Sequence, residues 1–183
     1  MSLLVLAPMA IEEAALGNTN RVLRTGMGSE RARIAAARAL AIDAGNVAIA
    51  GLCGGVDPTL QPGDVVVASE LRREDGTTVE VPGADELAEQ ARRHGLRAHV
   101  GAVVTTDRVL KPAERAKLEG ALAVDMESAW LADSAGGRPL AVMRVVVDKA
   151  GRRLSDPRIA VDGVRALRSL RRCGFVLSEW AGA

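Results

Sequence analysis

Residues 140–147 read LAVMRVVV, and this nearly continuous apolar run decides the fold class. A shorter run of the same kind, Val65–Val67, occurs earlier in the chain. Uninterrupted valine-rich runs are typical of strands that are buried on both faces, as the central strands of parallel sheets are. We therefore predict a sheet that is covered by helices on both sides.

Outward from these two runs, short β-branched or leucine-rich segments alternate with alanine-rich ones, which is the pattern of an α/β protein. Ser29 is a typical capping residue before an alanine-rich periodic stretch that stops just ahead of Gly45, so a helix is expected there. The polar segment Arg72–Gly83 predicts a hairpin or loop at the sheet margin. The predicted strands are Leu3–Ala7, Arg21–Thr25, Val47–Ala50, Asp64–Ala68, Arg97–Thr105, Leu122–Val124 and Leu140–Val147, and the predicted helices are Ser29–Ala44, Ala84–His94, Pro112–Glu119, Glu127–Ser134 and Ile159–Arg172.

Together these elements predict an α/β fold, a three-layer α/β/α sandwich with a mixed, mostly parallel sheet. The chain has 183 residues, of which 48% are hydrophobic, and this suits one domain spanning residues 1–183. A formal charge of +1 gives no general attraction for a polyanion, so we expect no nucleic-acid partner. The two cysteines and two histidines lack the close spacing of a metal centre, so none is predicted.

The first apolar segment, Leu3–Ala7, has no basic region before it and is interrupted by Pro8. It therefore predicts a strand rather than a signal peptide. No apolar run approaches the roughly 20 residues of a membrane-spanning helix. We expect a cytoplasmic protein with no transmembrane segment.

Glycine-containing or acidic clusters follow several predicted strands, at the edge where open α/β sheets place their ligand crevice. We expect these clusters to meet in one site. They are Ala7–Glu12, Thr25–Gly28, Gly51–Gly55, Asp125–Glu127 and Arg144–Asp148.

In this order the clusters resemble the nucleoside phosphorylase and nucleosidase superfamily, which includes the methylthioadenosine/S-adenosylhomocysteine nucleosidases. The motifs are Met-x-x-Glu near the start, Gly-Met-Gly, x-Gly-Gly followed by Pro-Gly-Asp, Met-Glu-Ser and Arg-x-x-x-Asp. The likeness is closer still to bacterial phosphorylase-like proteins associated with hopanoid lipid synthesis. The resemblance implies cleavage of the N-glycosidic bond of a purine nucleoside, with adenine as the expected base and an adenosylated hopanoid lipid as one candidate. It also implies a homo-oligomer.

Breaking the C1′–N9 bond builds positive charge on the ribose and negative charge on the departing base. The resemblance implies that Asp148 donates a proton to the base, that Glu12 activates an attacking water and that Arg144 orients these groups. It implies that Glu127 accepts hydrogen bonds from the ribose hydroxyls and that Met126 packs beneath the sugar. The further substrate-binding residues expected are Met9, Cys53, Gly54, Val109 and Asp125, and the expected water or phosphate site is Gly26, Gly28 and Leu52.

Three departures from the family pattern bear on the substrate. Leu52 replaces a serine, which leaves water and phosphate both open as the nucleophile. No cofactor is expected, but inorganic phosphate is an alternative co-substrate. Val109 stands where the nucleosidases stack an aromatic residue on the base, and Val147 replaces a serine near the purine edge. The sequence thus supports a purine more strongly than adenine.

Other readings of the same residues stay open. A methylthioadenosine/S-adenosylhomocysteine nucleosidase is the nearest alternative, and a non-catalytic nucleoside-binding protein is an alternative of another class. Structural roles are also conceivable, because Glu127 opens a predicted helix, where an acid is favoured in any case. Residues 164–177 place four arginines opposite an apolar arc, which predicts a core-facing helix or, alternatively, peripheral contact with a membrane surface.

Overall fold

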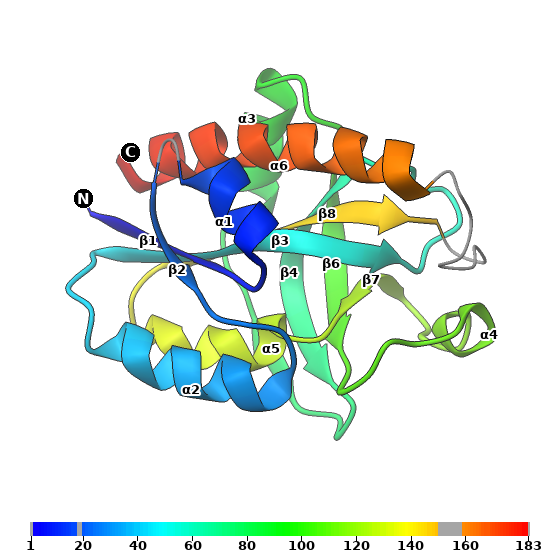
Figure 1. Ribbon diagram of the computed structural model, residues 1–183, viewed down its shortest axis with the longest axis horizontal. Coiled ribbons are helices and arrows are strands. Elements are labelled where there is room, and N and C mark those ends of the chain that lie inside the picture. The colour runs from blue at the N-terminus through cyan, green and yellow to red at the C-terminus, as the bar shows by residue number, and fades with distance from the viewer. Residues whose placement is uncertain (1, 18–19, 150–158, 183) are drawn as a thin grey trace.

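The computed structural model describes residues 2–17, 20–149 and 159–182, and its strands form one mixed sheet with helices on both faces (Figure 1). This confirms the predicted fold class. The strands are β1 (Leu3–Ala7), β2 (Arg21–Arg24), β3 (Asn46–Gly55), β4 (Val65–Arg73), β5 (Thr78–Glu80), β6 (Ala98–Thr105), β7 (Ala121–Asp125) and β8 (Leu140–Asp148). The helices are α1 (Ala10–Leu16), α2 (Ser29–Leu40), α3 (Ala84–Arg93), α4 (Pro112–Arg115), α5 (Ser128–Leu131) with the 3₁₀ turn η1 (Ala132–Ala135), and α6 (Ile159–Gly182).

The sheet has the strand order β2-β1-β3-β7-β6-β4-β5, and β8 pairs with both β3 and β4. The strands β3, β7, β6, β4 and β8 therefore close into a ring. Most of the pairs are parallel, while β3 with β7, β4 with β5 and β4 with β8 are antiparallel. Closure explains why β8, the strand predicted to be central, is buried along most of its length.

Two apolar cores flank the sheet. On one face the small alanines of α2, among them Ala32, Ala35 and Ala39, pack with α5 against β1 and β3. On the other face α6 contributes Leu170 and Leu177, and α1 and α3 pack beside it. The layers are visible in Figure 1, with α6 above the sheet and α2 below it.

Several boundaries differ from those predicted. The Met-x-x-Glu motif lies at the start of helix α1, which is absent from the predicted helices. A helix of seven residues is too short to give a clear periodic signal in the sequence. The glycine turn predicted at 51–55 is the continuation of β3, since Gly54 and Gly55 pair with β7. Helix α6 runs ten residues beyond its predicted end at Arg172, because Val176 and Leu177 pack into the core.

The remaining differences are smaller. Helices α2 and α4 end earlier than predicted, at Leu40 and Arg115. The expected hairpin is present at the sheet margin, where β5 pairs with β4.

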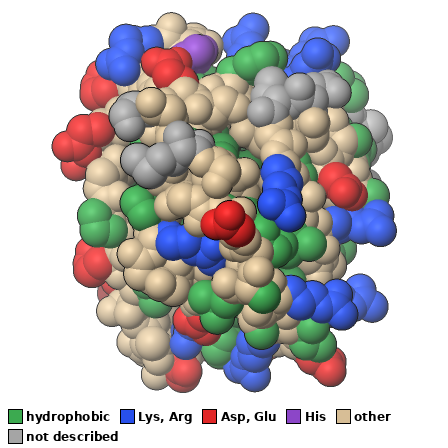
Figure 2. Space-filling view, turned by 90° about the vertical axis from the view of Figure 1, so that its left-hand side faces the viewer, with side chains coloured by type: hydrophobic (Ala, Val, Ile, Leu, Met, Phe, Trp, Pro, Cys, Tyr) green, Lys and Arg blue, Asp and Glu red, His purple; other side chains and the backbone are tan. Residues whose placement is uncertain are grey.

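Charged side chains of both signs are interspersed over the side of the molecule on which β1 begins and α6 ends (Figure 2). This mixing agrees with the net charge of +1. The solvent-facing side of α6 carries the four predicted arginines, Arg165, Arg168, Arg171 and Arg172, together with exposed Val161, Val164 and Phe175. Among the described residues, no helix is both long and apolar enough to cross a bilayer.

Candidate active site

A cavity of about 210 Å³ opens at the carboxyl ends of β1, β3, β6, β7 and β8. Its position is the one expected for a ligand crevice in an α/β sheet. Most of the predicted site residues line it, namely Met9, Glu12, Leu52, Cys53, Gly54, Val109, Asp125, Met126, Glu127 and Asp148. Gly26, Gly28 and Arg144 belong to the surrounding structure rather than to the lining.

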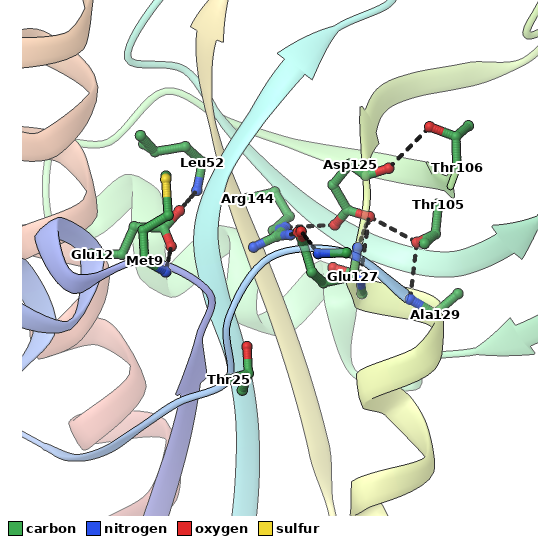
Figure 3. A network of polar contacts seen from close by, with 12 residues as sticks. Met9, Glu12, Thr25, Leu52, Thr105, Thr106, Asp125, Glu127, Ala129 and Arg144 are labelled. Atoms are coloured by element: carbon green, nitrogen blue, oxygen red, sulfur yellow. Dashed lines mark hydrogen bonds and ion pairs between the residues drawn. The ribbon is translucent and has the colours of Figure 1, made fainter. Parts of the chain in front are cut away.

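Arg144 lies in the middle of strand β8, behind the cavity wall formed by Glu12, Asp125 and Glu127, and is fully buried. Its Nε donates to Asp125 Oδ2 at 2.6 Å and its Nη2 donates to Glu127 Oε2 at 3.1 Å (Figure 3). Burial opposes its charge, but Asp125, Glu127 and Glu12 together raise the pKa of Arg144 above its usual value. Arg144 thus pairs directly with Asp125 and Glu127 and acts on Glu12 through its charge alone. We call these four residues the Arg144 cluster (Glu12, Asp125, Glu127 and Arg144).

Gly51 makes room for two members of this cluster. A methyl group at Gly51 would overlap Arg144 Nη1 and would lie 2.7 Å from Glu12 Oε1. The third nitrogen of the guanidinium, Nη1, has no hydrogen-bond acceptor within the part of the chain that the structure describes. A glycine at this point of β3 is therefore required for Glu12 and Arg144 to approach each other.

Glu12 is held by two backbone amides. Its Oε2 accepts from Met9 N–H at 2.7 Å and its Oε1 accepts from Leu52 N–H at 2.6 Å. Burial raises the pKa of Glu12, and the nearby Arg144 and the two amides oppose part of that rise. The carboxyl group is fixed in place at the cavity wall, with its affinity for a proton increased.

Glu127 precedes α5 and is also buried. Its Oε1 accepts from Gly28 N–H at 2.9 Å, while Oε2 accepts from Arg144. Burial raises the pKa of Glu127, against the attraction of Arg144, and Asp125 adds to the rise. The glycine pair Gly26 and Gly28, both with positive φ, brings the loop after β2 onto this carboxylate.

Asp125 orients its neighbours. Its Oδ1 accepts from the hydroxyl of Thr105 at 2.7 Å and from the N–H groups of Glu127 and Ser128 at 3.2 Å, while its Oδ2 accepts from Arg144. These bonds cap the start of α5 and fix both Glu127 and Arg144. Asp125 lines the cavity, but its main contacts are with protein groups.

The backbone N–H groups of the predicted water or phosphate site are all engaged. Gly26 N–H donates to Pro8 O at 3.1 Å, Gly28 N–H donates to Glu127, and Leu52 N–H donates to Glu12. An incoming anion would have to displace protein acceptors to use these donors.

At the other end of the cavity, Asp148 is buried at the end of β8 and pairs with Arg115 of helix α4. Arg115 Nη1 donates to Asp148 Oδ2 at 2.8 Å, and we call these two residues the Arg115 pair. Arg115 was not predicted. It stands in the segment KPAERAK, whose composition is that of a solvated helix, so the sequence carries no signal for it.

Cys53 is buried in the wall of the cavity, and burial raises the pKa of its thiol far above the usual value. The thiol is therefore protonated and unsuited to act as a nucleophile. Cys53 lines the cavity, and its contact with a substrate stays a prediction. Met126 is half-buried and Val109 is 53% exposed, so both present apolar atoms to the cavity.

Fold and site together define an enzyme of the nucleoside phosphorylase or nucleosidase type. The chain belongs to the Phosphorylase superfamily, whose family model matches residues 11–169. This confirms the family to which the sequence motifs pointed. A search of curated protein sequences finds no significant match.

Solved structures of the same fold cover nearly the whole chain. A 5′-methylthioadenosine/S-adenosylhomocysteine nucleosidase from Campylobacter jejuni is 18% identical with a TM-score of 0.83, covering 98% of this chain and 97% of its own. Futalosine hydrolase from Helicobacter pylori is 18% identical with a TM-score of 0.81, covering 100% and 98%. An S-adenosylhomocysteine nucleosidase from Streptococcus pyogenes, in complex with 5-methylthiotubericidin, is 22% identical with a TM-score of 0.79, covering 94% and 95%.

Proposed function

We propose that this protein hydrolyses the N-glycosidic bond of a purine nucleoside in the cavity between the Arg144 cluster and the Arg115 pair. The superfamily match supports this class of reaction, and two of the similar structures are nucleosidases while a third is a hydrolase. The observation that carries the proposal is the buried Glu12 carboxyl group at the cavity wall, anchored by two backbone amides.

The Arg144 cluster suits the sugar. It holds three carboxylates and one guanidinium, so its charge is negative when all are ionised. A negative environment stabilises the positive charge that develops on the ribose in the transition state. Glu127 would accept hydrogen bonds from the ribose hydroxyls, and half-buried Met126 would pack against the sugar.

Water is favoured over phosphate as the nucleophile. The three backbone donors that an oxyanion needs already bind protein acceptors, two of which are carboxylates. A phosphate would also be repelled by the carboxylates of the Arg144 cluster when these are ionised, in a site of low dielectric. Glu12 would accept a proton from the water as its oxygen bonds to C1′, and the electron pair of the broken C1′–N9 bond would go to the base.

Asp148 would act as the general acid that protonates the departing base. A proton from Asp148 to N7 would neutralise the departing purine. Before the next cycle Glu12 would release to solvent the proton that it gained from the water, and Asp148 would take up a proton in its place. A general acid of this kind contributes about 10²–10⁴ in rate.

The narrower substrate is a further part of the proposal. Exposed Met27 lines the cavity, which supports an apolar substituent on the 5′ side of the nucleoside. A lipid-linked nucleoside of the hopanoid type and a methylthioadenosine-type nucleoside both fit this description. Self-association, a cytoplasmic location and peripheral membrane contact through the basic face of α6 stay predictions.

The proposal is tested by incubating the purified protein with adenosine, inosine and methylthioadenosine, with and without inorganic phosphate, and separating the products by chromatography. We expect free base and free sugar without phosphate. Sugar phosphate formed only when phosphate is present would overturn water as the nucleophile. Nucleoside binding without release of base would overturn catalysis and favour a binding protein.

The matched variants are Glu12→Gln and Glu13→Gln, which change adjacent carboxylates of helix α1. Glu12 is buried at the cavity, whereas among the described residues the Glu13 side chain is recorded only in a long surface ion pair of 3.8 Å with Arg24. We expect Glu12→Gln to lower kcat about 10²–10⁴-fold and Glu13→Gln to leave it unchanged. Equal rates for both variants would remove Glu12 from the mechanism.

A further inference from the structure

Arg115 places a cation at the base end of the cavity. Its side chain is only 7% exposed, although it comes from the short surface helix α4. The guanidinium lies against the backbone of Gly54, where a Cβ atom would come within 3.0 Å of three of its atoms. The glycine therefore provides the space in which Arg115 reaches the cavity wall.

Arg115 has donors that the protein does not use. Among the described residues, Nη1 binds Asp148 while the buried Nε has no acceptor. A guanidinium offers five N–H donors and no acceptor. Because Arg115 lines the cavity, guanidinium N–H groups that are not bound to Asp148 can donate to an acceptor on a bound molecule.

The exposed edge of a purine distinguishes two classes of base. A 6-oxopurine presents two neighbouring acceptors, O6 and N7, whereas adenine presents the N7 acceptor beside an N6 amino donor. Arginine binds the O6 and N7 pair of guanine in one of the commonest specific contacts to a base. An amino group at position 6 would instead direct its N–H toward the N–H groups of Arg115.

We propose that Arg115 makes the base end of the cavity selective for a 6-oxopurine, such as hypoxanthine or guanine, over adenine. This inference rests on the proposed function and adds the class of base to it. In this arrangement Arg115 donates a hydrogen bond to O6, and Asp148 donates its proton to N7. The preference for adenine that the family resemblance implies is the competing prediction.

The same contact assists the reaction. When the C1′–N9 bond breaks, its electron pair passes to the base, and a 6-oxopurine spreads that charge onto O6. A cation already positioned at O6 stabilises this charge more strongly in the transition state than in the bound substrate. Arg115 would therefore affect kcat as well as binding.

The direct test measures the binding of free hypoxanthine and free adenine by calorimetry, since free bases need no sugar or 5′ group. We expect the wild-type protein to bind hypoxanthine roughly 5–150-fold more tightly than adenine. In Arg115→Gln, whose amide both donates and accepts, we expect the two affinities to become nearly equal. Tighter binding of adenine by the wild type, or an unchanged ratio in Arg115→Gln, would overturn the proposal.

Two further variants separate selectivity from folding. Arg115→Lys keeps the charge but loses the planar fork, so an intermediate ratio is expected. Arg168→Gln changes an exposed arginine of α6 and should leave the ratio unchanged. A shift of the ratio in Arg168→Gln equal to that in Arg115→Gln would contradict a specific role for Arg115.

Turnover of inosine and adenosine distinguishes this inference from the proposed function. Faster cleavage of inosine than of adenosine supports both the proposed hydrolysis and the selectivity for a 6-oxopurine. Faster cleavage of adenosine supports the proposed function and overturns the selectivity. Preferred binding of hypoxanthine without cleavage of either nucleoside, or of methylthioadenosine, supports the selectivity as a binding property and overturns the hydrolase.

Discussion

The two ends of the cavity hold the same kinds of group in different proportions. In the Arg144 cluster one buried guanidinium pairs with two carboxylates and lies near a third, whereas in the Arg115 pair one guanidinium binds one carboxylate. When all the carboxyl groups are ionised, the first end therefore has a net negative charge, whereas the two charges of the Arg115 pair balance. The difference matches the reaction, because the sugar becomes positive while the base becomes negative.

The comparison also separates structural from chemical roles. Arg144 comes from the middle of the central strand β8 and ties β7 and the start of α5 to it. Arg115 comes from a short surface helix and makes its ion pair with a single residue. We expect changes at Arg144 to act mainly on stability and changes at Arg115 mainly on the choice of base.

The largest expected difference is in stability. Arg144→Met would leave three carboxylates near one another without a cation, and breaking a buried ion pair costs about 3–5 kcal/mol. Arg115→Met leaves one carboxylate at a solvent-connected cavity, for which we expect a loss of about 1.5–3 kcal/mol. Urea unfolding of both variants measures the difference. Equal losses of unfolding free energy in the two variants would contradict a larger structural role for Arg144 than for Arg115.

A smaller difference is expected at the glycines that support the two arginines. Gly51→Ala would collide with Arg144 Nη1 and Glu12 Oε1, which are fixed by other bonds, and overpacking of this kind costs about 1–3 kcal/mol. Gly54→Ala would press on the end of the Arg115 side chain, which can move away more easily.

We therefore expect Gly51→Ala to lower the free energy of unfolding more than Gly54→Ala does. We also expect Gly54→Ala to weaken hypoxanthine binding. A methyl group at Gly163 in α6 would meet no atom of the described residues within 4 Å, so Gly163→Ala serves as the control for an added methyl group. A larger loss of unfolding free energy in Gly54→Ala than in Gly51→Ala would contradict the expected difference between the two arginines.

The smallest expected effect is a dependence of stability on pH at the Arg144 cluster. Burial raises the pKa values of Glu12 and Glu127 above 4.5, so the folded protein retains protons that the unfolded chain has lost. The contribution of each carboxyl to stability is thus greatest below 4.5 and declines as pH rises through its folded pKa.

The measurement compares the free energy of unfolding of the wild type and Glu127→Gln from acid to neutral pH. We expect the wild type to lose stability relative to the variant as the pH rises, by at most about 1.4 kcal/mol per pH unit. A relative gain would contradict the direction of the pKa shift.

Much of the fold follows from local patterns. The apolar runs at 65–67 and 140–147 predicted buried central strands, and both are central because β8 lies between β3 and β4. The alternation of strand-like segments and alanine-rich helical segments predicted a sheet with a layer of helices on each face. The acids Glu12, Glu127 and Asp148 were placed in one site because their motifs follow strands that end at the same edge of the sheet.

The sequence by itself determined the class of fold, the location of the site and the acids that line it, because burial and strand ends leave local, periodic signals. Only the tertiary structure decided the closure of the sheet through β8, the occupation of the backbone donors of Gly28 and Leu52, and the position of Arg115. Each of these depends on groups far apart in the chain. A charged side chain in a polar helix has the same local pattern whether it faces water or a partner 33 residues away.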